Sequence, residues 1–107
     1  MSDKLKIYIL IKDTVPVGHA VNCAAHASLG MYLEHQDKEI VKDWAENSFR
    51  KVSCKVSEEQ FNLAKSYSDH TLITESALDG KECALAFVPR YFWPDFFKTL
   101  QLYKWKN

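Results

Sequence analysis

The feature that most constrains the fold is the apolar run from Ile7 to Ile11 near the start of the chain. Lysine alternates with apolar residues from Lys4 onward, and the run then becomes continuously apolar, with β-branched and aromatic residues. This pattern predicts a strand that is buried on both faces in its middle. Pro16 and Gly18, in the polar segment that follows, predict where the strand gives way to a loop.

The rest of the chain predicts alternating helices and strands. Small and apolar residues recur at helical spacing from about residue 18 to His35, and alanines in this stretch are good helix formers. Ser57 and Gln60 form a capping box that opens a later helix. Asp79-Gly80 supplies turn chemistry for a hairpin. Further expected elements are a short helix at 40–47, strands at 49–56, 70–75 and 82–88, and a last helix beginning near Pro94.

This order of elements predicts an α/β fold. Connections through helices imply parallel strands with right-handed crossovers, and the hairpin makes the sheet mixed. We therefore expect a three-layer α/β/α sandwich with a four-stranded mixed sheet, formed by residues 1–107 as a single domain.

Composition excludes several classes of protein. The chain is 47% hydrophobic and has 14 Lys plus Arg against 14 Asp plus Glu, so it is too apolar to be disordered and lacks the overall charge of a general nucleic-acid binder. Three dispersed cysteines do not form a disulfide framework. Neither a signal peptide nor a membrane-spanning run is expected, which favours a cytoplasmic protein.

Three side chains that could carry chemistry share one face of the first helix: His19, Cys23 and His26. Imidazole and thiolate ligands suit zinc, but His19 and His26 are about 10 Å apart along the helix axis, so we expect no metal site. Cys23 beside His26 could be a nucleophile, although most cysteines simply pack in the core.

His19 stands at the expected N-terminus of this helix, beyond the carboxyl end of a strand, where ligands and anions bind in α/β sheets. An exposed histidine without a role is an equal alternative. Glu75, at the end of the third expected strand, could be a general acid or base, or only a solvated charge. The aromatic segment 91–97 could stack on bases, or belong to the core.

The segment 15–32, Val-Pro-Val-Gly-His-Ala-Val-Asn-Cys-Ala-Ala-His-Ala-Ser-Leu-Gly-Met-Tyr, resembles the first loop and helix of the type 2 peptidyl-tRNA hydrolases (the Pth2 family). The resemblance continues through 49–56, the Ser-Glu-Glu start of the next helix, 70–73 and 84–89. It implies the same fold, a tRNA or peptidyl-tRNA partner, no cofactor and a homodimer with the aromatic-rich C-terminal helix as a contact.

The chain departs from the family at several positions where the resemblance implies functional residues. The family's loop lysine falls on His19, its helix glutamine on Cys23, and its strand-end aspartate on Glu75, whereas its helix histidine is kept as His26. The segment 76–81 is shorter than in the family, and a family threonine falls near Cys83. The expected catalytic residues are His19, as base, and Glu75, which orients it. The expected substrate-binding residues are Gly18, Asn22, Cys23, His26 and Cys83.

Two functions follow from the resemblance and its departures. The first is hydrolysis of the ester between a peptide and the 3′ end of tRNA. The second is a catalytically altered domain that binds a nucleotide, RNA or protein without turnover, while a thiol hydrolase using Cys23 or Cys83 is a third reading. For tRNA to bind, basic residues must gather on one face. These include Lys12, Arg50, Lys51, Lys81, Arg90 and the C-terminal lysines.

Overall fold

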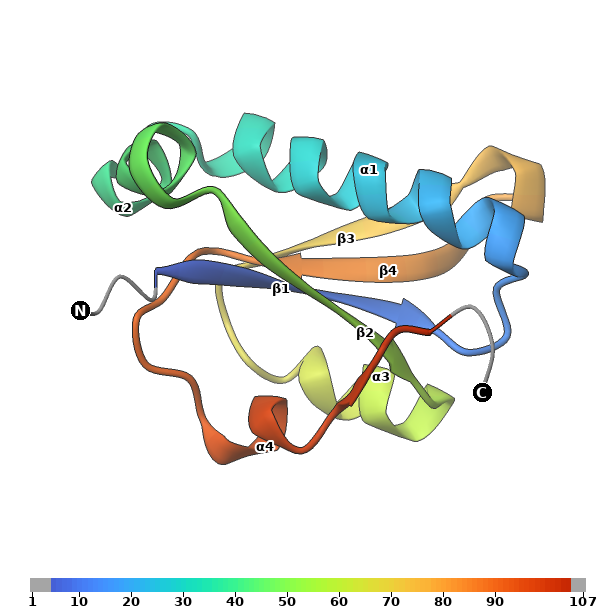
Figure 1. Ribbon diagram of the computed structural model, residues 1–107. Helices are drawn as coiled ribbons and strands as arrows, with labels where there is room; N and C mark the ends of the chain where they lie inside the picture. The colour runs from blue at the N-terminus through green and yellow to red at the C-terminus, as the bar shows by residue number, and fades with distance from the viewer. Residues whose placement is uncertain (1–4, 105–107) are drawn as a thin grey trace.

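A computed structural model describes residues 5–104 and contains a five-stranded sheet with helices on both faces (Figure 1). The strands are β1 (Lys6–Lys12), β2 (Arg50–Val56), β3 (His70–Glu75), β4 (Lys81–Phe87) and β5 (Gln101–Leu102). The helices are α1 (Val17–His35), α2 (Glu39–Asp43), α3 (Glu58–Ala64) and α4 (Asp95–Lys98). A π-helical turn, η1 (Trp44–Ser48), follows α2, and a 3₁₀ turn, η2 (Ser76–Leu78), follows β3.

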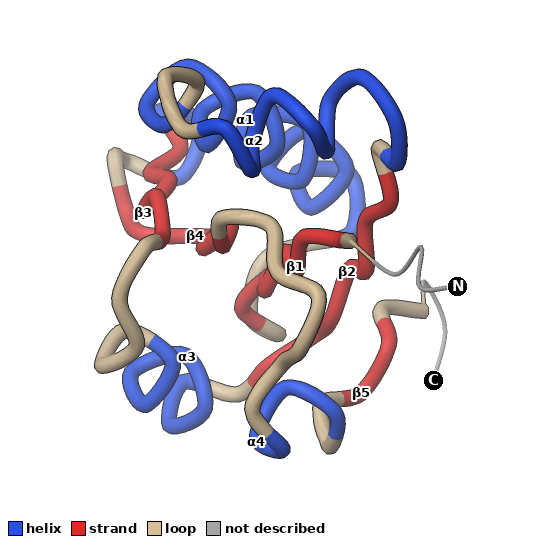
Figure 2. The backbone as a smooth tube through the Cα atoms, turned by 90° about the vertical axis from the view of Figure 1, so that its left-hand side faces the viewer, coloured by secondary structure: helices blue, strands red, loops and turns tan. Residues whose placement is uncertain are grey.

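The three-layer arrangement predicted from the sequence is present. The strands lie in the order β3-β4-β1-β2-β5, with α1 and α2 over one face of the sheet and α3 and α4 over the other (Figure 2). Among residues 5–104, none of the helices is both long and apolar enough to cross a membrane.

The prediction of four strands was wrong, because a short fifth strand forms near the C-terminus. β5 is antiparallel to β2. Leu102 of β5 pairs with Cys54 of β2, and the Tyr103 N–H donates to the Ser53 carbonyl. A two-residue strand is too short for any period in the sequence to reveal it. The last helix is correspondingly short, ending at Lys98.

The directions of the strands set the position of the candidate site. β1 is parallel to β2 and antiparallel to β4, and β3 is antiparallel to β4, as the predicted hairpin requires. β1, β2 and β3 therefore run in the same direction, although β3 is not a neighbour of the other two. Their carboxyl ends share one edge of the sheet, which is where ligands bind in α/β folds.

The apolar run that predicts a doubly buried strand forms the middle of the sheet. Ile7, Ile9 and Ile11 belong to the core beneath α1, whereas Tyr8 and Leu10 belong to the core on the α3 and α4 side. In the aromatic segment, Trp93 and Phe97 are buried in the second core, but Phe92 is 87% exposed. The core interpretation of this segment therefore holds for Trp93 and Phe97.

Small residues allow α1 to lie close to the sheet. Its buried residues are Ala20, Cys23, Ala27 and Met31. A Cβ on Gly30 would lie only 3.1 Å from Cδ1 of Ile73 in β3, so a glycine suits this close approach.

Candidate functional site

Glu75 and His26 face each other at the carboxyl edge of the sheet. Oε1 of Glu75, the last residue of β3, lies 3.4 Å from Nε2 of His26 in α1. Glu75 Oε2 accepts a hydrogen bond of 3.2 Å from the Ala77 N–H. The Glu75 side chain is 12% exposed and its Oε1 is buried without a hydrogen bond to the described residues, whereas the His26 side chain is 57% exposed. The pair thus combines a shielded carboxylate with an imidazole that a substrate can reach.

The pairing follows from the way α1 and β3 run past each other. Thr71 Oγ1 donates to Glu34 Oε1 at 2.6 Å at one end, and Glu75 meets His26 at the other. From Thr71 to Glu75 a strand rises about 13 Å, and from Glu34 to His26 a helix rises about 12 Å. Because these lengths are nearly equal, both contacts can form between the two elements. His19 is seven residues further along α1, or about 10 Å beyond the end of β3.

The expected contact between Glu75 and His19 is therefore not the one that forms. Within residues 5–104, no hydrogen bond or ion pair joins His19 to Glu75, and His19 is half-buried near the start of α1. The reason is the offset along the helix, which brings His26 rather than His19 level with the strand end. A catalytic role for His19 stays a prediction.

The two cysteines expected to bind substrate lie beneath this pair rather than at its surface. Cys23 and Cys83 are fully buried, and their thiols lie close enough for Cys23 to raise the pKa of Cys83. Cys83 is the extra residue of a β-bulge, because Ile73 pairs with Ala84 and Thr74 with Glu82. Gly18 and Asn22, the other expected substrate-binding residues, are exposed on the first turns of α1.

The environments of Cys83 and Cys54 make both thiols unsuited to act as nucleophiles. Burial raises the pKa of Cys83 to about 12, the Cys23 thiol and the Glu75 carboxylate add to the rise, and Lys12 opposes it. Burial likewise raises the pKa of Cys54 to about 11. Since the thiolate is the reactive form, both groups are poor nucleophiles at neutral pH.

We expect the free energy of unfolding to fall as the pH rises from about 9 to 11. The Cys54 thiol keeps its proton to a higher pH in the folded chain than in the unfolded chain. The unfolded state loses this proton first, so stability is lost above the unfolded pKa, by on the order of 1 to 2 kcal/mol. Urea unfolding across this pH range would measure the slope. A Cys54→Ala variant should show a shallower slope, and an identical slope would contradict the assignment.

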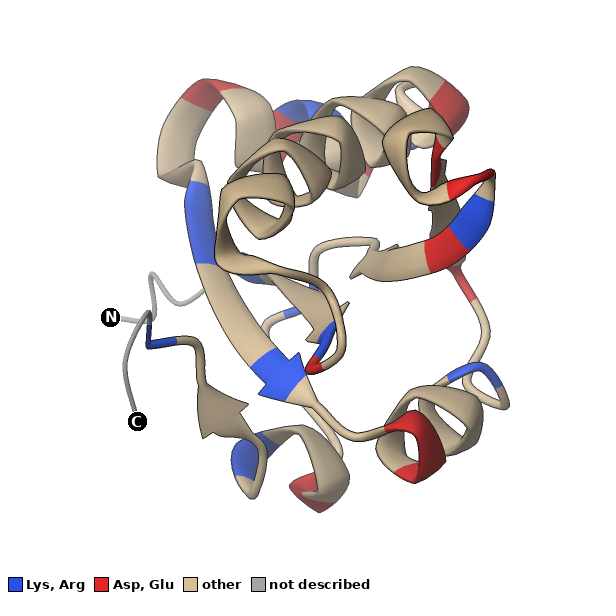
Figure 3. Ribbon diagram, turned by 90° about the vertical axis from the view of Figure 1, so that its right-hand side faces the viewer, with Lys and Arg blue, Asp and Glu red and all other residues tan. Residues whose placement is uncertain are grey.

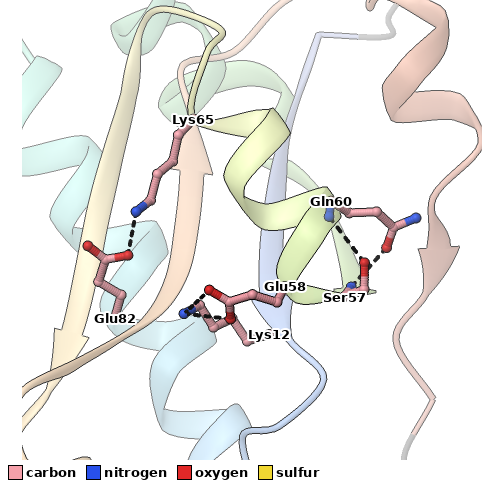
Figure 4. A network of polar contacts seen from close by, with 6 residues as sticks. All are labelled: Lys12, Ser57, Glu58, Gln60, Lys65 and Glu82. Carbon is pink, nitrogen blue, oxygen red and sulfur yellow. Dashed lines mark hydrogen bonds and ion pairs between the residues drawn. The ribbon is translucent and has the colours of Figure 1, made fainter.

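A cleft of about 450 Å³ opens at the same edge of the sheet. Its lining includes Lys12, Lys81, Ala77 and Leu78, of which the last two belong to the η2 turn that follows Glu75. The lysines of this cleft have acidic side chains beside them. Lys12 Nζ lies 3.1 Å from Glu58 Oε1, Lys65 pairs with Glu82, and the Ser57–Gln60 capping box fixes the start of α3 beside them (Figure 4).

The basic residues expected to gather on one face are instead divided between the two ends of the sheet. Lys12 and Lys81 lie at the carboxyl edge, whereas Arg50 and Arg90 lie at the other end, where both align with Lys6. Acidic and basic residues alternate around the carboxyl edge (Figure 3). The C-terminal Lys106 is outside the described residues.

His19, Cys23 and His26 do not form a metal centre with other ligands. Among residues 5–104 there is no group of three or more His, Cys, Asp and Glu side chains able to hold a metal ion. The contact of His26 with Glu75 and of Cys23 with Cys83 already engages two of the three side chains.

The sequence model of the peptidyl-tRNA hydrolase PTH2 family matches residues 5–87. The chain belongs to this family. The matched range contains the first four strands, α1 and both members of the Glu75–His26 pair. A comparison with curated proteins gave no match. Membership supports a peptidyl-tRNA hydrolase-like function at the level of the family, and it confirms the resemblance inferred from segment 15–32.

Proposed function

We propose that this PTH2-family protein hydrolyses the ester that joins a peptide to the 3′ end of tRNA. The observation that carries the proposal is the shielded Glu75 carboxylate held 3.4 Å from the accessible His26 imidazole. A carboxylate that orients an imidazole, which in turn faces the reacting groups, is a recurrent arrangement for acyl transfer. The location at the carboxyl edge of the sheet supports the same reading.

In this mechanism the Nε2–H of His26 points to Glu75, which leaves Nδ1 free to accept a proton. Nδ1 takes a proton from water as the water oxygen bonds to the ester carbonyl carbon. The tetrahedral intermediate then collapses, the bond to the 3′ oxygen of tRNA breaks, and the imidazolium returns its proton to that oxygen. The products are a peptide acid and a tRNA with a free 3′ hydroxyl.

The first turn of α1 supplies a place for a phosphate of the tRNA. Val17 and Gly18 open the helix, and backbone N–H groups at a helix N-terminus attract anions. Their distance of about 12–14 Å from His26 along the helix suits a substrate phosphate better than the oxyanion of the reaction. His19 stands in this turn, so it is placed to add a further contact to the same phosphate.

The direct test is to incubate the purified full chain with an N-acetylated aminoacyl-tRNA and to follow release of the free tRNA. We expect turnover, and we expect His19→Ala to raise KM several-fold with little change in kcat. A large fall in kcat with an unchanged KM would instead make His19 the base, as the sequence predicts. An intact substrate after prolonged incubation with micromolar protein would contradict the proposal.

Binding of a nucleotide, RNA or protein without turnover is the second candidate, and the pairing of basic with acidic groups at the site favours its protein-binding form. Lys12 and Lys65 each contact a carboxylate, so tRNA phosphates would have to displace Glu58 and Glu82. Calorimetric titration with deacylated tRNA separates the cases. Affinity without hydrolysis favours a binding module, and the absence of both favours a protein-interaction role.

A homodimer and a cytoplasmic location stay predictions. The C-terminal helix, expected as the dimer contact, exposes little aromatic surface, because Phe97 is buried and Phe96 is half-buried. Sedimentation equilibrium would give the oligomeric state.

A further inference from the structure

A groove separates α1 from β2 on the face of the sheet that α1 and α2 cover. α1 packs mainly on β3, β4 and β1, so on this face, within the described part of the chain, only the η1 turn lies over β2, at the start of that strand (Figure 2). The groove has a volume of about 600 Å³, and its lining includes Ile9, Ala24, Leu29, Trp44, Phe49 and Lys51. It lies on the opposite flank of α1 from the Glu75–His26 pair and is not part of the proposed hydrolytic site.

The groove is long enough for about three turns of a helix. A second hollow of about 290 Å³ shares Ala24 and Ser53 with it and extends past Val21 to Tyr103. Together they follow α1 from Val21 to Tyr32, which corresponds to about 16 Å of helix. Val21 is 67% exposed and Leu29 is 58% exposed. Such a stripe of exposed apolar side chains marks an interaction surface.

The charge along the groove has one sign. Among residues 5–104, Lys51 is the one Lys, Arg, Asp or Glu in the lining of either hollow. Its Nζ lies 3.3 Å from the centre of the Phe49 ring and 5.3 Å from that of Trp44, and partial burial lowers its pKa. Lys55, two strand pleats further along β2, lies over the Tyr103 ring. Figure 3 shows basic segments at both ends of β2 beside an α1 flank that is free of charged residues.

We propose that this groove is a docking site for an amphipathic helix of a protein partner, with carboxylates beside its apolar face. Alanine and serine at 24, 25 and 28 would let a helix approach α1 closely, and β2 would form its floor. Apolar anchors at i, i+4 and i+7 would fill the groove, and an acidic side chain would pair with Lys51. The partner would complete the layer that α1 leaves open.

A second copy of this chain fits the groove less well. Its acidic helices α2 and α3 bury Val41 and Phe61 in their own cores, and Leu63 is the one large apolar side chain that they leave exposed. RNA also fits less well, because the lining is mostly apolar and its described residues offer a single cation for phosphates.

The test uses a fluorescein-labelled helical peptide of about 15 residues, with leucines at i, i+4, i+7 and i+11 and glutamates flanking them. We expect micromolar binding by fluorescence anisotropy. A matched peptide with lysine in place of glutamate should bind at least tenfold more weakly. Lys51→Glu should weaken binding of the acidic peptide at least tenfold, and Leu29→Asp should abolish it.

Leu33→Asp is the matched control, because Leu33 is equally exposed on α1 but lies outside the groove lining. It should leave binding unchanged, and circular dichroism should show that each variant is folded. Failure of the acidic peptide to bind at millimolar concentration, or equal loss in Leu33→Asp and Leu29→Asp, would overturn the proposal.

Three further results would show that something other than a partner helix occupies the groove, and each would also overturn the proposal. Self-association that Leu29→Asp abolishes would identify a second copy. A single-stranded oligonucleotide that displaces the peptide and depends on Lys51 would identify RNA. Peptide binding seen only after replacement of Trp105, which lies beyond the described residues, would identify the chain's own C-terminus.

Discussion

Replacing His26 with alanine is expected to slow peptidyl-tRNA hydrolysis by about 10²- to 10⁴-fold, the usual contribution of a positioned general base. His26 is the accessible member of the pair, with its Nε2 held 3.4 Å from Glu75 Oε1. Removing the imidazole removes the group that would accept the proton of the attacking water. The loss should fall on kcat, because the imidazole acts mainly in the transition state.

Glu75→Gln provides a matched test of the same pair. The amide keeps the shape of the side chain but loses the charge that favours the Nε2–H tautomer of His26. We expect kcat to fall by less than in His26→Ala, with KM nearly unchanged. The double variant should be no slower than His26→Ala alone, because the carboxylate acts through the imidazole.

The control is His35→Asn, which changes the same residue type on the same helix. His35 is nine residues from His26, or about 13 Å along the helix axis, and should leave turnover unaffected. An active His26→Ala variant alongside an inactive His19→Ala variant would transfer the role of base to His19.

The largest effect on stability is expected for Phe97→Ala, which should lower the free energy of unfolding by about 3–5 kcal/mol. Phe97 is 1% exposed, although it belongs to a helix of only four residues. Its ring centre lies 4.9 Å from that of Trp93, 5.0 Å from that of Phe87 and 5.4 Å from that of Tyr8. Truncation leaves a cavity and removes these aromatic contacts.

Phe92→Ala is the control for this prediction. Phe92 belongs to the same aromatic segment but is 87% exposed, so its loss should change stability by no more than about 0.5 kcal/mol. Urea unfolding at neutral pH measures both variants. A Phe97→Ala variant within 1 kcal/mol of the parent would show that the C-terminal segment does not stabilise the sheet as described.

Local signals in the sequence predicted most of the secondary structure. The apolar run at Ile7–Ile11, the small-residue helix to His35 and the Ser57–Gln60 capping box each act within a few residues. The hairpin between β3 and β4 follows from Asp79, whose φ is 59°, and Gly80, whose φ is 73°. β5 was missed because its two residues are held by pairing with β2 rather than by their own pattern.

The sequence by itself determined which residue types are available for chemistry and on which face of each element they lie. Alternation puts Thr71, Ile73 and Glu75 on one side of β3, and a spacing of four aligns Glu34, Gly30 and His26 on α1. Only the tertiary structure decided which of two histidines on α1 meets Glu75. That choice depends on how far the helix is displaced along the strand, which is set by long-range packing, such as the close approach at Gly30, and not by any local period.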